Sequence, residues 1–346
     1  MRLIPGLAAA TLVAATVRAL HGALPDSFAR ILGEAVFAVL LGLVIGNAVK
    51  LPASTVPGIR FAFQTVLRAA IVLLGAGLSF IAALTIGLKA LSLIVLLMAL
   101  ALATSHALGR RLGVSSKLAS LIGVGTAVCG NSAISATAPV IGAKDEDVAY
   151  AIATNTLFGT LAVFAYPLIG RALGLSDAEF GSWAGTAVND TSQVVASGFA
   201  FSDEAGRIAT VVKLTRNALI GAVIVGMGLL HGRAKGTGRG GFALRLSQSA
   251  PPFVIGFLVM ATLNTLGVFE RLAGATGMDV RAALQWAARA LILVALAGVG
   301  LGTRIAAMRR TGLLPLWLGL ATALVTSVAS YTWIRLIGPA AGARFH

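Results

Sequence analysis

Long apolar runs follow one another along almost the whole chain, and they restrict its possible folds more than any other feature. A helix needs roughly 20 largely apolar residues to cross the hydrocarbon core of a bilayer. The chain has 346 residues, 58% of them hydrophobic, and such runs are separated only by short charged or Gly/Pro-rich segments. We therefore predict an all-α integral membrane protein of about 10–11 transmembrane helices. The predicted spans lie near residues 4–22, 32–50, 66–84, 89–108, 118–142, 147–170, 180–200, 205–231, 251–268, 284–303 and 313–337.

The segments between these runs are too short to form a second domain. We expect residues 1–346 to form a single polytopic transmembrane domain, with a peripheral first helix at 4–22 and a repeat-bearing core over about 32–337. The first run resembles a signal peptide, but Arg18 interrupts its end and no small-x-small cleavage site follows. It is therefore predicted to be a membrane helix.

The distribution of charge excludes a nucleic-acid-binding protein and indicates an orientation. The net charge is +15, but only 11% of the residues are charged, and the basic ones stand in small groups between the apolar runs. A nucleic-acid-binding protein gathers them on one soluble face, so the expected partner is the lipid bilayer. Counting eleven spans places most basic residues, Arg60 and Arg68 among them, on the side of the N-terminus. The positive-inside rule then predicts a bacterial inner-membrane protein with a cytoplasmic N-terminus.

Short motifs recur along the chain and suggest a duplicated fold. The pairs are Gly125-Thr-Ala-Val128 with Gly185-Thr-Ala-Val188, Asn155-Thr-Leu-Phe-Gly159 with Asn217-Ala-Leu-Ile-Gly221, and Gly75-Ala-Gly-Leu78 with Gly298-Val-Gly-Leu301. Internal repeats are typical of secondary transporters, which bind their substrate where the repeats meet. On eleven spans the last pair would be inverted and the first pair parallel. Either one segment is re-entrant, or one similarity arises by chance.

The predicted fifth span is interrupted where a lipid-facing helix would stay apolar. Gly125, Gly130 and Pro139 weaken a continuous helix. Asn131 and Ser132 are suitable N-cap residues for a half-helix that begins there. A break at membrane depth is tolerated only where protein or water satisfies the backbone. The N-terminus of a half-helix carries unpaired N–H groups and a partial positive charge, which favour an anion.

Charged residues mark the seventh and eighth spans. Asp190 lies inside the seventh, and acids within a span are costly and by default indicate function. Lys213, Arg216 and Asn217 stand at i, i+3 and i+4 in the eighth, so they share one helix face. These residues could meet an anionic substrate. Alternatively, the two cations could extend to an interface, and Asp190 could cap a helix or neutralise Arg216.

Three polar blocks resemble the YeiH-like family, whose members carry the label of sulfate exporter. The blocks are residues 126–141, 184–196 and 210–217, within a likeness that covers about residues 30–335. Asn189 stands where many relatives are expected to carry histidine, so no proton role is assigned to that position. The resemblance implies a relation to the bile acid–sodium symporter and cation–proton antiporter superfamily. It also implies two unwound helices that cross at the substrate site. The sulfate label is a family-level assignment, and likeness of fold does not establish a substrate.

These observations favour a secondary active transporter that exports a small inorganic or organic oxyanion, such as sulfate or sulfite, coupled to a proton or sodium ion. The predicted substrate-binding residues are Asn131, Ser132, Thr191, Ser192, Gln193, Lys213, Arg216 and Asn217, and the predicted ion-coupling residues are Asp190 and Asn155. We expect no cofactor, no metal site and no enzymatic activity, since neither a nucleotide-binding loop nor a nucleophile with its base is evident. An intramembrane enzyme and a passive anion channel are the alternatives, and a homodimer is left open.

Overall fold

The computed structural model describes residues 2–23, 34–231, 252–303 and 313–340, and no strand occurs in these ranges. Its elements are α1 (Ile4–Ala23), α3 (Glu34–Ala48), η1 (Ala53–Thr55), α4 (Val56–Phe61), η2 (Ala62–Val66), α5 (Leu67–Leu74), η3 (Gly75–Gly77), α6 (Phe80–Arg111), α7 (Ser116–Ala127), α8 (Asn131–Ile141), α9 (Asp145–Ala172), α10 (Asp177–Ala187), α11 (Thr191–Phe201), α12 (Asp203–Ala218), α13 (Ile220–Leu230), α15 (Pro252–Thr265), α16 (Val268–Thr276), α17 (Val280–Gly302) and α19 (Leu313–Ile337).

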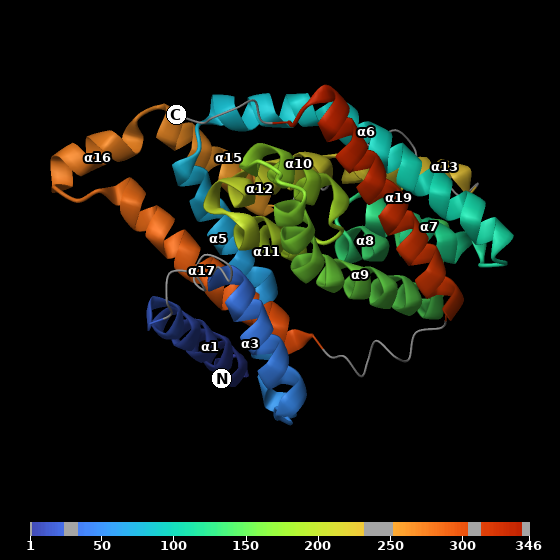
Figure 1. Cartoon of the computed structure of the whole chain (residues 1–346), viewed down its shortest axis with the longest axis horizontal. Coiled ribbons are helices and arrows are strands. Elements are labelled where there is room, and N and C mark those ends of the chain that lie inside the picture. The colour runs from blue at the N-terminus through green and yellow to red at the C-terminus, as the bar shows by residue number, and fades with distance from the viewer. Residues whose placement is uncertain (1, 24–33, 232–251, 304–312, 341–346) are drawn as a thin grey trace.

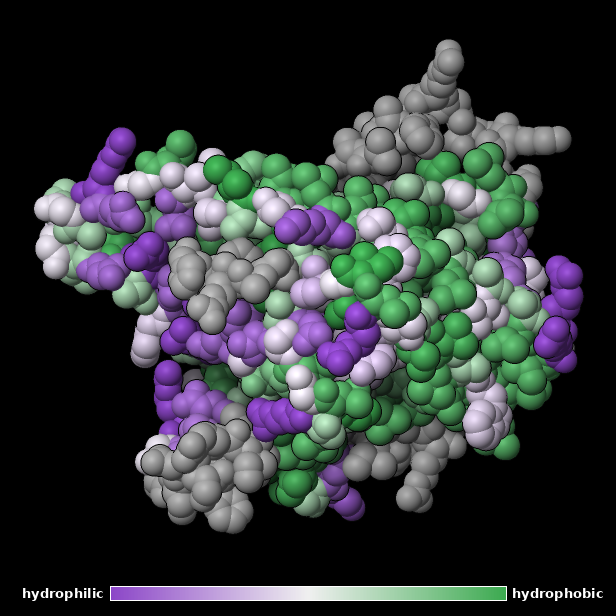
Figure 2. All heavy atoms as spheres, turned by 45° about the horizontal axis from the view of Figure 1, so that its top comes forward, coloured by the Kyte–Doolittle hydropathy of each residue, from purple (hydrophilic) through white to green (hydrophobic). Residues whose placement is uncertain are grey.

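The all-α membrane architecture is confirmed. Seven described helical segments are long and apolar enough to cross a bilayer, and the pair α15–α16, bent by 65°, would make eight. The total reaches the predicted eleven if α3 and the interrupted pairs α7–α8 and α10–α11 also cross. Figure 2 shows broad apolar areas on the surface, with hydrophilic side chains gathered mainly on the left of that view. Many large apolar side chains are exposed, among them Leu12, Leu168 and Trp317, as expected of side chains that face lipid.

The helices form two groups, defined by which of them pack together. The scaffold consists of α1, α3, the continuous rod α4–η2–α5, and α15 to α17, with α17 packed along α3 and α5. The crossing bundle consists of α6 to α13 and α19, in which α12 packs against both α10 and α11. The two groups touch chiefly where α11 meets α3 and where α6 meets α15. A cavity therefore remains between them.

The span predicted at 66–84 is wrong in position. The apolar helical segment runs over residues 53–77, and the next helix begins at Phe80 rather than near residue 89. Arg60 interrupts the apolar run in the sequence, so the predicted span begins after it, whereas the helix continues through it. Arg60 and Arg68 both lie well inside the helical segment, so the count of basic loop residues used for the orientation loses two members.

Candidate functional site

Two breaks in the crossing bundle lie against each other. Residues 128–130 separate α7 from α8, and residues 188–190 separate α10 from α11. Gly130 has a φ of +69°, and a Cβ placed on it would lie 3.2 Å from the Cα of Asp190. The two interrupted helices predicted from the sequence are therefore present and meet at their breaks.

Lys213 and Arg216 of α12 stabilise the C-terminal ends of the first half-helices. The Lys213 ammonium donates to the carbonyls of Val128 (2.8 Å), Val188 (3.1 Å) and Asn189. The Arg216 guanidinium donates to the carbonyls of Ala127 (2.6 Å), Thr186 (2.7 Å) and Val188 (3.3 Å). A helix C-terminus leaves carbonyls unpaired and carries a partial negative charge, so a cation there is doubly favourable.

The predicted contact of these two cations with substrate does not fit this geometry. Lys213 is 0% and Arg216 4% exposed. Neither lines the cavity, and neither forms an ion pair with Asp190. Their side chains point toward the backbone carbonyls at the ends of α7 and α10. In this structure they hold the backbone at the two breaks and do not reach the cavity.

The N-termini of the second half-helices face the cavity. The N-cap of α11 is Asp190, which accepts hydrogen bonds from the Ser192 backbone N–H (2.9 Å) and from its hydroxyl (2.6 Å). The N-cap of α8 is Gly130, and no side chain caps that helix. The N-terminus of α11 is therefore already bound by a carboxylate, whereas α8 has no side-chain cap and its partial positive charge favours an anion.

Asparagines on the following long helices hold both second half-helices by their first residues. Asn155 of α9 donates to Asn131 (3.0 Å), and Asn217 of α12 donates to Thr191 (3.1 Å). Gly159 has no side chain, and the Gln193 amide lies where a Cβ of residue 159 would be. The recurring Gly-Thr-Ala-Val and Asn-x-x-x-Gly motifs thus occupy equivalent places at the two breaks. The Gly-x-Gly-Leu pair does not, because one copy ends a helix and the other lies inside α17.

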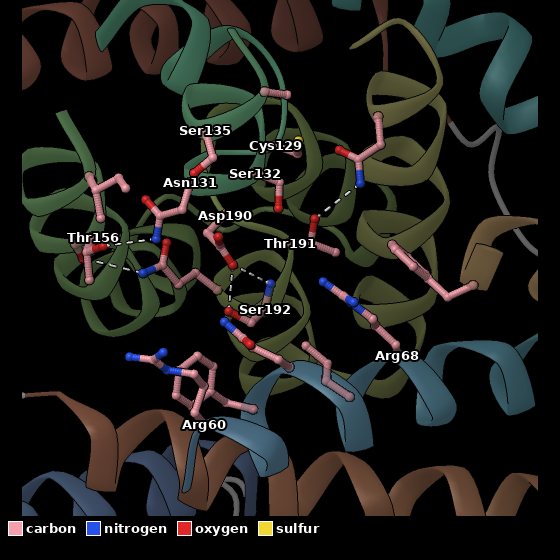
Figure 3. Close-up of a pocket in the computed structure, with 18 of the residues that line it drawn as sticks. Arg60, Arg68, Cys129, Asn131, Ser132, Ser135, Thr156, Asp190, Thr191 and Ser192 are labelled. Carbon is pink, nitrogen blue, oxygen red and sulfur yellow. Dashed lines mark hydrogen bonds between the residues drawn. The ribbon is translucent and has the colours of Figure 1, made fainter. Parts of the chain in front are cut away.

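A cavity of about 1650 Å³ lies between the scaffold and the crossing bundle. The predicted residues that line it are Asn131, Ser132, Pro139, Asp190, Thr191, Ser192, Gln193 and Asn217. Asn155, Lys213 and Arg216 are not among its lining residues. The scaffold side contributes Arg60, Gln64 and Arg68, and Figure 3 shows both arginines across from the polar residues of the breaks.

Arg60 and Arg68 line the cavity but were not predicted as site residues. At 1.5 Å per residue they lie about 8 and 5 Å from the middle of the helical segment 53–77. Neither has a carboxylate partner in the described part of the chain, although Arg68 lies 5.8 Å from the ring of Phe253. The spacing of Arg60, Gln64 and Arg68, at i, i+4 and i+8, is the signal that indicates one helix face.

The element η2, between the two arginines, is a short π-helix. Such segments within α-helices occur frequently at functional sites. Gln64 and its neighbour Thr65 belong to η2 and line the cavity. The polar face of this helix therefore continues between the two guanidinium groups.

The comparisons with known proteins agree with this architecture. The family model described as Conserved hypothetical protein 698 matches residues 5–319. UPF0324 membrane proteins are similar to the chain over most of its length: one from Clostridium tetani is 33% identical over 87% of this chain and 89% of its own. Another from Streptococcus pyogenes is 36% identical over 90% of this chain and 91% of its own. One from Agrobacterium fabrum is 37% identical over 81% of this chain and 78% of its own. The chain belongs to the UPF0324 membrane protein family. The resemblance to the YeiH-like family fits this membership.

Of the three residues predicted to break the helices, only Gly130 lies in a break of this UPF0324 chain. Gly125 lies within α7, two residues before its end. Pro139 lies inside α8, which continues to Ile141 and ends at Gly142. Proline removes the backbone donor to the carbonyl of Ser135, yet α8 continues for two residues beyond it.

We expect Gly130→Ala to destabilise the UPF0324 fold. Its φ of +69° disfavours any side chain, and the new Cβ would lie 2.7 Å from the Asn155 amide nitrogen. The strain alone costs of order 1–3 kcal/mol, and the clash adds to it, so thermal unfolding of the purified protein should begin at a clearly lower temperature. Gly113→Ala is the matched control, because Gly113 also has a φ of +69° but open space around it. Equal effects of the two substitutions would show that the close contact of Gly130 with Asn155 and Asp190 adds nothing to stability.

Proposed function

We propose that this protein is a secondary active transporter that exports a small oxyanion, such as sulfate or sulfite, across the bacterial inner membrane, with its N-terminus in the cytoplasm. One observation carries the proposal. Two arginines without carboxylate partners among the described residues face the N-terminus of α8 across a cavity at membrane depth.

The energetics of these arginines favour an anionic ligand. A charged side chain at the centre of a membrane helix costs about 2.5–3.5 kcal/mol on insertion scales. Arg60 and Arg68 together would impose roughly twice that cost, and Asp190 is the one acid among the described residues that line the same cavity. The carboxylate of Asp190 already accepts two hydrogen bonds from Ser192. An oxyanion would add the missing negative charge and would accept hydrogen bonds from both guanidinium groups and from Ser132.

The position of the cavity favours transport over fixed binding. It lies between two helix groups that touch each other only locally, with charge on the scaffold and helix N-termini on the crossing bundle. Movement of one group past the other would open the site first to one side of the membrane and then to the other. Discontinuous helices at a midplane site are typical of secondary transporters. The proposal assigns no chemical reaction to the chain.

Coupling to a cation is the second element of the proposal. Asp190 is the acid that lines the cavity, and it can bind a proton or contribute to a sodium site. Buried side-chain amide oxygens of Asn155, Asn189, Gln193 and Asn217 have no hydrogen-bond partner in the described structure. Hard cations prefer oxygen ligands, and these unpaired oxygens favour a coupling-ion site near the breaks.

Radiolabelled sulfate and sulfite flux in proteoliposomes tests the proposal. Flux that requires an imposed proton or sodium gradient would support a secondary transporter and would identify its coupling ion. Flux without any gradient dependence would indicate a passive channel instead. Protein that is folded but moves neither these ions nor an organic sulfonate would refute the proposal.

We expect Asp190→Asn to remove the dependence of transport on the ion gradient while leaving the fold intact. Asparagine is as good an N-cap as aspartate, so the bond to the Ser192 backbone N–H can persist while the ionisable group is lost. The control is Asp279→Asn, since Asp279 caps α17 by the same kind of bond to Ala282 (2.9 Å) and is absent from the cavity lining. Gradient-dependent flux retained by the Asp190 variant would exclude this residue as the coupling group.

A further inference from the structure

The size of the cavity exceeds what a small inorganic oxyanion requires. Its volume is about 1650 Å³, whereas pockets that hold a drug-sized molecule usually have about 300–1,000 Å³. The charged and hydrogen-bonding groups described above occupy only part of it. The rest of the lining therefore bears on what the substrate is.

Polarity changes from one end to the other of the cavity wall that α8 contributes. On α8 the lining begins with Asn131, Ser132 and Ser135 and continues with Pro139 and Val140. The distance from Ser132 to Val140 is about 12 Å at 1.5 Å per residue. Other helices add to the apolar part. We define the apolar wall by six lining residues, Pro139, Val140, Ile152, Ile220, Ile224 and Phe253.

The polar and apolar parts of the cavity meet at Arg68. Its guanidinium lies 5.8 Å from the ring of Phe253, which belongs to the apolar wall. Ile71, three residues further along α5 than Arg68, also lines the cavity. A ligand held by Arg68 would therefore have hydrocarbon surface directly beside its charged group.

We infer that the substrate is an amphipathic organic oxyanion, such as an alkyl sulfonate, with its headgroup at the arginines and the N-terminus of α8 and its hydrocarbon body along the apolar wall. The inference rests on the proposed transport function and names the substrate class of that same site. An apolar wall in contact with water is unfavourable, and a hydrocarbon body would remove this contact at about 0.8 kcal/mol for each buried CH₂ group.

The test is the binding of a homologous series to the full chain in lipid nanodiscs. Sulfate, methanesulfonate, butanesulfonate and octanesulfonate share the anionic group and differ in the apolar body. We expect affinity to rise about fourfold for each methylene that enters the apolar wall and then to level off. Octylammonium is the control for partition into the bilayer, because it has the same chain and the opposite charge, and it should not compete.

A variant of the apolar wall separates this inference from the anion site itself. Val140→Thr replaces one methyl group of the apolar wall with a hydroxyl of similar size. The variant should therefore weaken octanesulfonate binding by at least about fivefold. Methanesulfonate affinity should not change. Val95→Thr is the matched control, since Val95 is 52% exposed on α6 and does not line the cavity.

The possible outcomes distinguish failure of the amphipathic substrate from failure of the proposed transport function. If sulfate binds as tightly as octanesulfonate, or if affinity does not depend on chain length, the inference is overturned while the transporter proposal stands. If no anion of the series binds to folded protein, the proposed function fails as well. If Val140→Thr weakens all members of the series equally, the apolar wall does not hold the hydrocarbon body.

Discussion

Arg68→Gln is expected to weaken binding of the transported anion by about 100-fold and to abolish measurable flux. Removing one partner of a desolvated, hydrogen-bonded charge pair costs roughly 2–5 kcal/mol, and glutamine keeps a donor but loses the charge. Arg68 lies in mid-segment, lines the cavity and has no carboxylate partner among the described residues. The measurement is equilibrium binding of the labelled anion to purified protein, followed by flux in proteoliposomes.

Two variants control this experiment. Arg68→Lys keeps the charge and should recover part of the affinity, because ammonium still attracts the anion but lacks the planar two-donor geometry of guanidinium. Arg271→Gln removes an exposed arginine of α16 outside the cavity and should leave both binding and flux unchanged. Undiminished affinity in the Arg68→Gln variant would show that the anion binds elsewhere.

The elements of the crossing could be predicted from the sequence because they depend on local chemistry. Glycine and polar residues at membrane depth cannot belong to an ordinary lipid-facing helix, and the structure does place breaks at residues 128–130 and 188–190. The cap at Asp190, one of the open alternatives for that residue, also follows from a local preference. The internal repeat stays a prediction, although Asn155 and Asn217 donate corresponding hydrogen bonds to the first residues of α8 and α11.

The surroundings of the two pairs of cations could not be predicted from the sequence, for a physical reason. Whether a cation inside a span is buried, paired or exposed to a cavity depends on helices far away in the chain. Lys213 binds the carbonyl of Val128, which is 85 residues away. Arg60 and Arg68 interrupt an apolar run as loop residues do, and only the packing of the scaffold shows that they face a cavity. Pro57, in the first turn of α4, is the local signal that the helix begins before Arg60.

Lys213→Met is expected to destabilise the protein more than any other single substitution considered above. Methionine has a similar length but no donors, so the carbonyls of Val128 and Asn189 would lose the ammonium group, while Val188 would keep only its longer bond from Arg216. Each buried acceptor left unsatisfied costs about 1–3 kcal/mol, and one of the two charges that offset the half-helix C-termini disappears as well. The yield of folded protein and its unfolding temperature in detergent should both fall sharply.

The same variant decides between the two roles considered for Lys213. A positioning residue predicts low stability, with anion affinity retained in whatever fraction remains folded. Direct substrate binding predicts the reverse: normal stability and lost affinity. Lys89→Met is the matched control, because Lys89 is exposed on α6 and its substitution leaves no buried carbonyl without a donor. A Lys213→Met protein as stable as the parent but unable to bind the anion would return this residue to the substrate site, and Arg60 and Arg68 would then not be the sole charge that attracts the anion.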